Sequence, residues 1–428
     1  MTEKEKSSPR IKGDSVIWIV FIALCLISIV EVFSASSNLT YSTTNYWSPM
    51  LKHTILLLVG VVFMVLTMNI KCKYFTIITP LALFFSFFFL ILCYAYGAIN
   101  DGHRWLPLPF GLNFQPSEMA KGSVILFVAC VIGRYQTDNG VDKRAFKYIC
   151  GISGLYIVLI GLENLSTAAL LAIVVAAMMW IGRVSKRQLG KLFGTIAILV
   201  TIGFATVMLL GNDNKDVPQD SRMTMVEKTK PKKSGLFHRF DTWKSRIDKF
   251  IDNKEVPAEE YDLDVEAQEG FSQIAIASSN LVGKGPGNSV ARDFLPQAYS
   301  DFIFAIIIEE VGVWGAGIVC FLYITLLFRA AVIASRCAYT FPAMLVLGLS
   351  LMFAVQALFN MGVAVGWLPV TGQPLPLISK GGTSSIMNCV YMGMILSVSC
   401  TAKKKEEVAE KNGNSNKVNI ANQTLANQ

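Results

Sequence analysis

Ten apolar stretches long enough to cross a lipid bilayer follow one another along this 428-residue chain. The hydrocarbon core of a membrane is about 30 Å thick, so a helix needs roughly 20 mainly apolar residues to cross it. The stretches comprise residues 16–33, 53–70, 74–97, 117–134, 146–162, 165–182, 190–211, 302–329, 342–364 and 384–401. Charged residues make up only 16% of the chain, against about 25% in a soluble domain. We therefore predict an all-α polytopic membrane protein with about ten transmembrane helices.

The basic residues predict the orientation of these helices. Lysine and arginine are enriched in the cytoplasmic loops of membrane proteins. Here they precede the first stretch, recur in every second short loop and follow the last stretch, at Lys4, Lys6, Arg10, Lys12, Lys71, Lys73, Arg134, Lys143, Arg144, Lys147, Arg183, Lys186, Arg187, Lys191 and Lys403 to Lys405. Both termini are therefore predicted to be cytoplasmic. This bias also accounts for the net charge of +8 without a nucleic-acid partner.

The first stretch is predicted to be a retained span. Val16–Phe33 is longer than the apolar region of a signal peptide, and no small-residue cleavage site follows it.

One long connection, residues 212–300, separates the seventh and eighth stretches and is predicted to lie on the outer side. Its first part carries opposite charge blocks, Lys228–Lys233 and Glu255–Glu269, which indicate a solvated segment. Phe271–Val282 is apolar but too short to span, which favours a re-entrant or interfacial helix. The predicted organisation is a cytoplasmic tail (1–14), a membrane domain (15–401) with the outer loop 212–300 and its re-entrant part near 271–300, and a disordered tail (402–428).

The nine cysteines lie within the apolar stretches or near their cytoplasmic ends, at positions 25, 72, 93, 130, 150, 320, 337, 389 and 400. None falls in an outer loop, where an oxidising compartment would favour disulfides. The chain has only three histidines, and no cysteine–histidine spacing is typical of a metal site. The sequence thus predicts neither structural disulfides nor a cysteine-based metal centre.

Three acidic residues stand at or inside the eighth stretch. Asp301 lies where the outer loop meets this stretch, and it could either cap the helix or act chemically. Glu309 and Glu310 lie within the stretch, where an ionisable residue marks a pathway or site by default. At about 100° per residue, Glu309 lies nearer the face of Asp301. A buried structural ion pair would account equally well for the two glutamates.

Charged residues also open the fourth stretch. Glu118 suits the N-terminal end of a helix dipole, but Lys121 would lie inside the membrane and needs a partner or a polar cavity. Upstream, Arg104 stands beside Trp105. This pair could anchor the chain at the membrane interface, or the arginine could bind a phosphate.

The run before the last stretch, Gly366–Ser385, is rich in glycine and proline and is predicted to be non-helical at membrane depth. Such backbone persists only where it lines a cavity or is buried in protein. Within it, Lys380-Gly-Gly-Thr383 opens a helix and offers N–H groups, a hydroxyl and a cation to an anion.

Taken together, these segments resemble the SEDS family (shape, elongation, division and sporulation), the FtsW/RodA group of peptidoglycan glycosyltransferases. The matching segments keep the family's order across residues 15–401: Arg104-Trp105, Phe114–Glu118 with Lys121, Glu163–Thr167, Gly283–Ser289, Asp301–Ala305 with Glu309 and Glu310, and Asn360–Gly382. The pattern Phe294–Asp301 is more similar to the division branch, FtsW, than to the elongation branch. The sequence departs from the common pattern at Lys380 (often tyrosine), Thr371 (lysine in some relatives), Ser279-Asn280 (commonly Gly-Gly) and in the longer charged stretch 212–265.

The resemblance implies a function: polymerisation of the lipid-linked disaccharide-peptide lipid II into glycan strands at the outer face of the bacterial cytoplasmic membrane, at the division septum. It implies that Asp301 matches the family's essential aspartate and that Asp293 matches a second acidic residue of the division branch. The implied partner is a class B penicillin-binding transpeptidase, together with other division proteins.

This reaction requires a base and positive charge. A sugar 4-hydroxyl must lose a proton as it attacks an anomeric carbon that bears a polyprenyl diphosphate, and one displacement inverts that carbon to give a β-1,4 bond. A carboxylate base contributes about 10²–10⁴-fold, and we expect Asp301 to be that base. The diphosphate needs cations, from the candidates Arg104, Lys121, Lys284, Arg292 and Lys380. Trp105, Glu118 and Asp293 complete the predicted substrate-binding residues. Mg²⁺ or Mn²⁺ could share the cationic role, although no ligand set is evident.

Two other functions are compatible with the sequence. A lipid II flippase would use intramembrane charges such as Glu31 and the broken backbone before the last stretch, and an inverted repeat would favour it, but none is evident. A non-catalytic division scaffold would leave Asp301 dispensable. A flippase needs polar groups through the full membrane depth, whereas Asp301, Arg104 and the Gly/Pro-rich runs cluster at the outer face.

Overall fold

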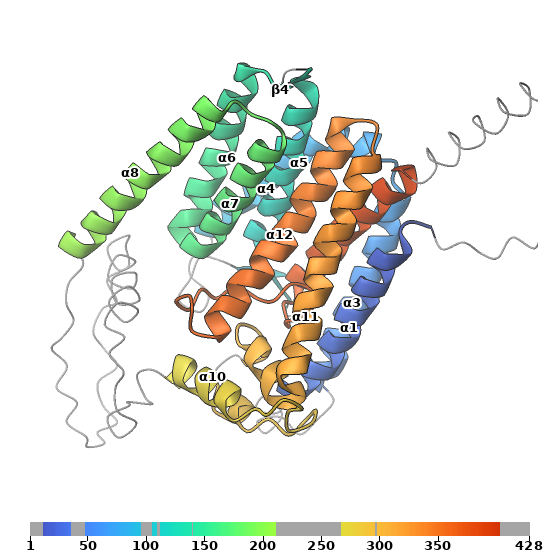
Figure 1. Cartoon of the computed structure of the whole chain (residues 1–428), viewed down its shortest axis with the longest axis vertical. Coiled ribbons are helices and arrows are strands. Elements are labelled where there is room, and N and C mark those ends of the chain that lie inside the picture. The colour runs from blue at the N-terminus through green and yellow to red at the C-terminus, as the bar shows by residue number, and fades with distance from the viewer. Residues whose placement is uncertain are drawn as a thin grey trace, which may run out of the picture. The chain divides into compact units, whose positions relative to one another are not determined.

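The computed structural model describes residues 12–35, 48–95, 105–108, 112–138, 140–210, 267–295 and 298–402 (Figure 1). The chain divides into two units. One contains residues 1–185 and 267–428, and the other contains residues 186–266, of which α8 (Lys186–Leu210) is described. The predicted tails and the charged stretch 212–265 lie almost entirely outside the described residues.

The first unit is built mainly of helices. This is expected in a membrane, because lipid offers no hydrogen-bond partners and the backbone N–H and C=O groups must bond to one another. Its long helices are α1 (Ser15–Ala35), α3 (Ser48–Asn69), α4 (Lys73–Ala95), α5 (Pro116–Arg134), α6 (Lys143–Glu163), α7 (Leu165–Ile181), α11 (Ile303–Arg336), α12 (Thr340–Ala364) and a C-terminal helix (Thr383–Ala402). Two hairpins pair β1 (Leu106–Leu108) with β2 (Leu112–Phe114) and β3 (Gln136–Thr137) with β4 (Gly140–Val141).

The predicted all-α polytopic fold is confirmed. In the described part of the chain, eight helices are long and apolar enough to cross a membrane. The other two of the ten predicted spans correspond to α7, with 17 residues, and to α8. The predicted re-entrant segment, near 271–300, overlaps the second half of α10 (Ala267–Ala277) and includes the short η2 (Ala291–Asp293).

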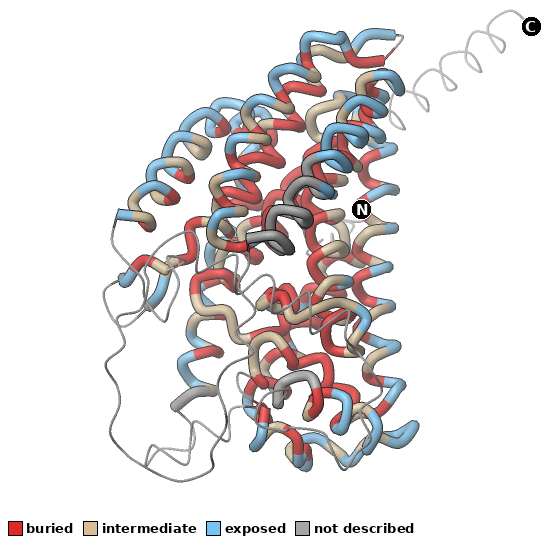
Figure 2. Tube along the Cα trace, turned by 90° about the vertical axis from the view of Figure 1, so that its left-hand side faces the viewer, coloured by how far each residue is buried: buried red, intermediate tan, exposed pale blue. Residues whose placement is uncertain are grey.

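The centre of the first unit is formed by α5 and the C-terminal helix, whose most apolar 18 residues are 72% buried, against 22% for α4. Figure 2 shows that buried and exposed residues alternate along the helices, as expected of helices that each turn one side to the interior. Close approach of these two helices depends on a glycine. A Cβ atom added at Gly122 of α5 would lie 2.3 Å from the ring of Tyr391. Small residues commonly allow such packing between membrane helices, where the hydrophobic effect does not drive association.

The long helix α11 is broken near its start. Gly312 has φ 76° and ψ −170°, which divides the helix into a short outer part and a long inner part. The break leaves carbonyl groups without helical partners, and the outer loop supplies donors. The backbone N–H of Lys284 donates to the carbonyl of Glu309 at 2.9 Å, and that of Gly285 donates to the carbonyl of Glu310 at 2.8 Å. The break therefore fixes the glycine-rich loop against α11.

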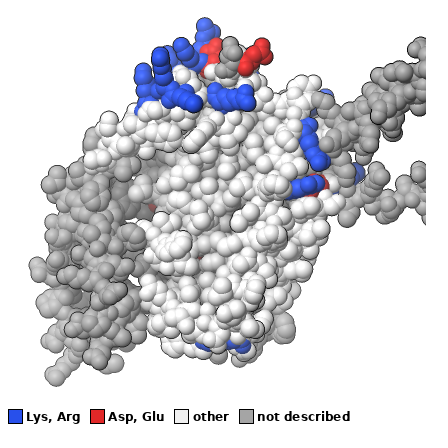
Figure 3. Space-filling view, viewed as in Figure 1, with Lys and Arg blue, Asp and Glu red and all other residues white. Residues whose placement is uncertain are grey.

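Basic side chains gather at one end of the first unit. Figure 3 shows them at the end that carries β4, where α5 ends and α6 begins, while the flank of the helices is almost free of charge. In Figure 1 α10 lies at the opposite end. This distribution agrees with the predicted orientation, with the β4 end cytoplasmic and α10 on the outer side.

Candidate active site

Asp301 lies two residues before α11, but it does not cap this helix. The N-cap residue is Phe302, and no side-chain hydrogen bond caps the helix. The Asp301 carboxylate instead accepts a hydrogen bond from the Ser300 hydroxyl at 2.9 Å. The side-chain amide of Asn360 holds the Asp301 carbonyl at 2.8 Å and also donates to the Gln373 carbonyl at 2.8 Å. Of the two readings that the sequence left open, the structure thus disfavours capping.

The structure brings Lys380 next to the segment that ends in Asp301. The Lys380 backbone N–H donates to the Tyr299 carbonyl at 3.0 Å, and its Nζ lies 4.7 Å from the centre of the Tyr299 ring. The Ser379 hydroxyl donates to the Ser300 carbonyl at 2.6 Å. A carboxylate and an amine that are 79 positions apart in the sequence therefore sit on two backbone segments that are bonded to each other.

The environment shifts the pKa values of two groups in this region. Burial, and then the negative charge of Asp301, raise the pKa of the Tyr299 phenol above its ordinary value. Burial, and then the positive charge of Lys52, lower the pKa of the Lys380 amine. Tyr299 therefore stays neutral, and Lys380 loses its proton more readily than an exposed lysine does.

Polar side chains from α12, α1 and α11 hold the non-helical run that carries Lys380, and the end of the run is bonded to β2. Gln356 donates to the Pro374 carbonyl at 3.0 Å, and Ser28 donates to the Ile378 carbonyl at 2.7 Å. Tyr323 donates to the Pro376 carbonyl. The Thr383 hydroxyl, which starts the C-terminal helix, donates to the Asn113 carbonyl of β2 at 2.8 Å. These bonds give partners to backbone carbonyls outside the helices, as irregular backbone at membrane depth requires.

Glu118 and Lys121 form a buried ion pair. Their charged atoms are 2.8 Å apart, and Lys121 is 0% exposed. Lys121 also donates to the side-chain oxygen of Gln356 at 2.8 Å. Because Gln356 in turn holds Pro374, the pair is connected to the run that carries Lys380. Both residues remain predicted substrate ligands, but here their partners are protein groups.

The glutamates of α11 bind the outer loop. Glu309 pairs with Lys284 at 2.7 Å and accepts bonds from the Ser289 hydroxyl at 2.5 Å and from the Val290 N–H at 3.1 Å. Glu310 accepts the N–H groups of Gly287 at 2.9 Å and Ser289 at 3.2 Å, and the hydroxyl of Ser34. The structural reading of the two glutamates is thus favoured, with the loop as their partner.

The remaining predicted site residues lie around this loop or beyond the described ranges. Arg292 donates from Nη1 to the Ser34 hydroxyl at 3.0 Å, and its Nε lies 3.9 Å from the exposed carboxylate of Asp293. Trp105 is half-buried just before β1. Arg104 lies outside the described residues.

Several residues that organise the site were not singled out individually from the sequence. Ser300 and Ser379 look like ordinary loop residues. Gln356 and Asn360 carried a usable signal, because two amides four residues apart inside an apolar helix fall on one face and require polar partners. Within the described residues no cluster of three or more His, Cys, Asp or Glu side chains could hold a metal ion, and all nine cysteines are free thiols.

The fold and this outer site define a polytopic membrane protein in which the segment before a broken helix, ending in Asp301, is bonded to a non-helical run that carries Lys380. A family model described as "Cell cycle protein", FtsW/RodA/SpoVE, matches residues 14–404. The chain belongs to this family, and the resemblance seen in its motifs is confirmed.

Curated relatives are similar over most of their length. The chain is 27% identical to the "Probable peptidoglycan glycosyltransferase FtsW" of Aromatoleum aromaticum, over 88% of this chain and 85% of that protein. It is 29% identical to the peptidoglycan glycosyltransferase MrdB of Escherichia coli K12, over 79% of this chain and 82% of that protein.

Two solved structures share the fold. A chain from a study of a peptidoglycan synthase complex that coordinates polymerisation and crosslinking matches with a TM-score of 0.66 at 22% identity, covering 91% of this chain and 98% of that one. The rod shape determining protein RodA of Thermus thermophilus matches with a TM-score of 0.60 at 19% identity, covering 90% and 96%.

Proposed function

We propose that this protein is a peptidoglycan glycosyltransferase that polymerises lipid II into β-1,4 glycan strands on the outer side of the cytoplasmic membrane. The observation that carries the proposal is the setting of Asp301, which does not cap α11 and whose backbone segment is bonded to the one that carries Lys380. Membership of the FtsW/RodA/SpoVE family and the names of the curated relatives support it.

Asp301 acts as the general base in this mechanism. Its carboxylate takes the proton of the acceptor sugar's 4-hydroxyl as that oxygen forms a bond to the anomeric carbon of the donor. The bond from that carbon to the diphosphate oxygen breaks, and the polyprenyl diphosphate leaves with the electron pair. One displacement inverts the anomeric carbon. The Ser300 hydroxyl, 2.9 Å from Oδ1, orients the carboxylate.

Lys380 is the candidate cation whose own backbone N–H is bonded to the segment that ends in Asp301. It stands three residues before the helix that starts at Thr383, so a leaving diphosphate there would meet both an amine and the N–H groups of the first helical turn. Lys284 and Arg292 lie on the outer loop and are engaged by Glu309 and Ser34. Because the described residues offer no cluster of metal ligands, we assign no step to Mg²⁺ or Mn²⁺.

The cellular role and the partner are inferred from one sequence segment and from the comparisons. The segment Phe294–Asp301 favours the division branch, whereas identity to FtsW and MrdB relatives is similar, at 27% and 29%. We propose a role at the division septum with a class B penicillin-binding transpeptidase as partner. The fold shared with a chain of a peptidoglycan synthase complex supports the partner.

The deciding experiment measures glycan polymerisation by the purified protein from lipid II, with and without the transpeptidase. Asp301→Asn should lower the rate at least about 100-fold, because it removes a general base. Asp138→Asn makes the same chemical change on the exposed β3–β4 turn and should leave the rate unaltered. Normal polymerisation by correctly folded Asp301→Asn would contradict the mechanism. Lipid II translocation without polymerisation by the unaltered protein would instead identify a flippase.

A further inference from the structure

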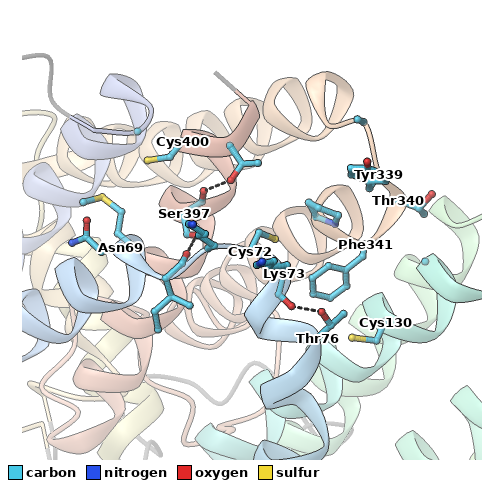
Figure 4. A pocket seen from close by; sticks show the side chains of 18 of the residues that line it. Asn69, Cys72, Lys73, Thr76, Cys130, Tyr339, Thr340, Phe341, Ser397 and Cys400 are labelled. Atoms are coloured by element: carbon cyan, nitrogen blue, oxygen red, sulfur yellow. Dashed lines mark hydrogen bonds between the residues drawn. The ribbon is translucent and has the colours of Figure 1, made fainter. Parts of the chain in front are cut away.

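A cavity of about 1270 Å³ lies at the end of the helices that the basic residues mark as cytoplasmic. Its walls come from the α3–α4 turn, the end of α5, the α11–α12 turn and the end of the C-terminal helix (Figure 4). The inner part of α11, from Gly312 to Arg336, separates this cavity from the candidate active site by about 36 Å of helical rise. The cavity therefore plays no part in the proposed transfer reaction.

The charged residues that line the cavity are all basic. They are Lys12, Lys71, Lys73 and Arg134, and no aspartate or glutamate lines it. In the part of the chain that the structure describes, none of the four makes an ion pair; Lys12 contacts the Asn69 side chain at 3.3 Å and Lys73 lies 5.1 Å from the Tyr74 ring. The neighbouring carboxylate, Asp14, is held by Arg329 at 2.7 Å. The cavity thus has a positive potential with no internal counter-charge.

The same cavity has apolar walls. Met68 and Ile70 line it at the end of α3, and Phe341 and Pro342 line it at the start of α12. The polar Ser397 is already engaged, because its hydroxyl donates to the Ile70 carbonyl at 2.5 Å. A small hydrophilic anion would gain nothing from such walls. An amphiphile with a negative head and an apolar tail uses both the cations and the walls.

We propose that this cavity binds an anionic phospholipid of the inner leaflet. Lys71, Lys73 and Arg134 hold the phosphate, and the first part of an acyl chain lies against Met68 and Phe341. The volume exceeds the roughly 300–1,000 Å³ of sites for drug-sized ligands, as a headgroup with part of a chain requires. Basic pockets between membrane helices on the cytoplasmic side are a known setting for such headgroups.

The test is native mass spectrometry of the full-length protein in detergent, titrated with phosphatidylglycerol or phosphatidylcholine. We expect saturable binding of phosphatidylglycerol that phosphatidylcholine does not match. Lys71→Gln/Lys73→Gln should weaken phosphatidylglycerol binding about 30-fold, from the usual contribution of two basic residues near an anionic headgroup. Arg144→Gln/Lys147→Gln removes two exposed charges from α6 at the same end and should leave binding unaltered.

Two further variants test whether lipid binding needs the space of the cavity as well as its charges, and whether the chain's own acidic tail competes with the lipid. Thr76→Trp fills the cavity from the exposed side of α4 without changing charge and should weaken binding. Glu406→Gln/Glu407→Gln removes acidic residues beyond the C-terminal helix and should have no effect. The proposal would be overturned if the two double charge variants lost phosphatidylglycerol binding equally, or if Thr76→Trp lost none. It would also be overturned if the glutamate changes tightened binding, or if inorganic phosphate displaced the lipid.

Discussion

Gly283 and Gly312 face each other so closely at the break in α11 that neither position has room for a Cβ atom. A Cβ at Gly283 would lie 2.3 Å from the Glu310 carbonyl oxygen, and a Cβ at Gly312 would lie 2.3 Å from the Leu281 carbonyl oxygen. Both glycines also have positive φ, 75° and 76°. The obstacles are backbone atoms, so no side chain can move aside to relieve the overlap.

Gly312→Ala should therefore destabilise the protein by about 3 kcal/mol, from strained backbone together with lost contacts between the loop and α11. Thermal unfolding in detergent and size-exclusion profiles would report the change. Gly317→Ala, in the same helix with open space around it, is the matched control and should be neutral or slightly stabilising. Equal stability of the two variants would mean that the loop does not pack on the break.

The ion pair between Glu118 and Lys121 should show strong coupling. Lys121→Met leaves a buried carboxylate without its cation, and Glu118→Gln leaves a buried ammonium without its anion. Each single change should cost about 3–5 kcal/mol, while the double variant should cost clearly less than the sum. A double-mutant cycle on unfolding would measure this, and additive costs would show that the two charges act independently.

Asn360 should act as a positioning residue for Asp301. Asn360→Ala removes donors to the carbonyls of Asp301 and Gln373, which lets the segment before α11 move. We expect a fall in kcat of about 10- to 100-fold with a smaller change in KM, because small displacements of a base are costly. Ser350→Ala removes a buried hydroxyl that bonds only within α12 and should retain activity. A change confined to KM would argue against positioning.

The lowered pKa of Lys380 gives activity a predicted pH dependence. Its positive charge is lost as pH rises through a pKa that lies below the ordinary value for lysine. Lys380→Gln should lower polymerisation about tenfold or more near pH 7, and its deficit relative to the unaltered protein should shrink at alkaline pH. Lys380→Arg should keep its activity to higher pH, since arginine stays charged. Parallel profiles of all three proteins would show that the charge of Lys380 is not used.

The fold was largely predictable because the length and hydropathy of apolar stretches identify membrane helices in a sequence. Each of the ten predicted stretches corresponds to a helix, although in the described residues only eight of these helices are long and apolar enough to cross a membrane. What the sequence could not provide was the break at Gly312. A lone glycine in an apolar helix is common, and its conformation here depends on a loop about 30 residues earlier in the chain.

The site was predicted in its parts but not in its connections. Asp301 and Lys380 were identified separately, whereas their neighbouring position follows from the bonds of Tyr299 and Ser300 to the non-helical run. Lys121 illustrates the opposite case. An intramembrane lysine suggested a role toward substrate, yet its partners are Glu118 and Gln356, which spacing alone does not distinguish from a ligand.

The short helix α7 has a consequence for the surrounding lipid. Its 17 residues rise only about 26 Å, less than the roughly 30 Å of an average hydrocarbon core. The buried side chain of Asn164 caps its first turn through the N–H groups of Ser166 and Thr167, so the helix does not extend further in that direction. Local thinning of the bilayer beside α7 would remove this hydrophobic mismatch. The protein would locally deform its membrane and favour shorter acyl chains along this flank.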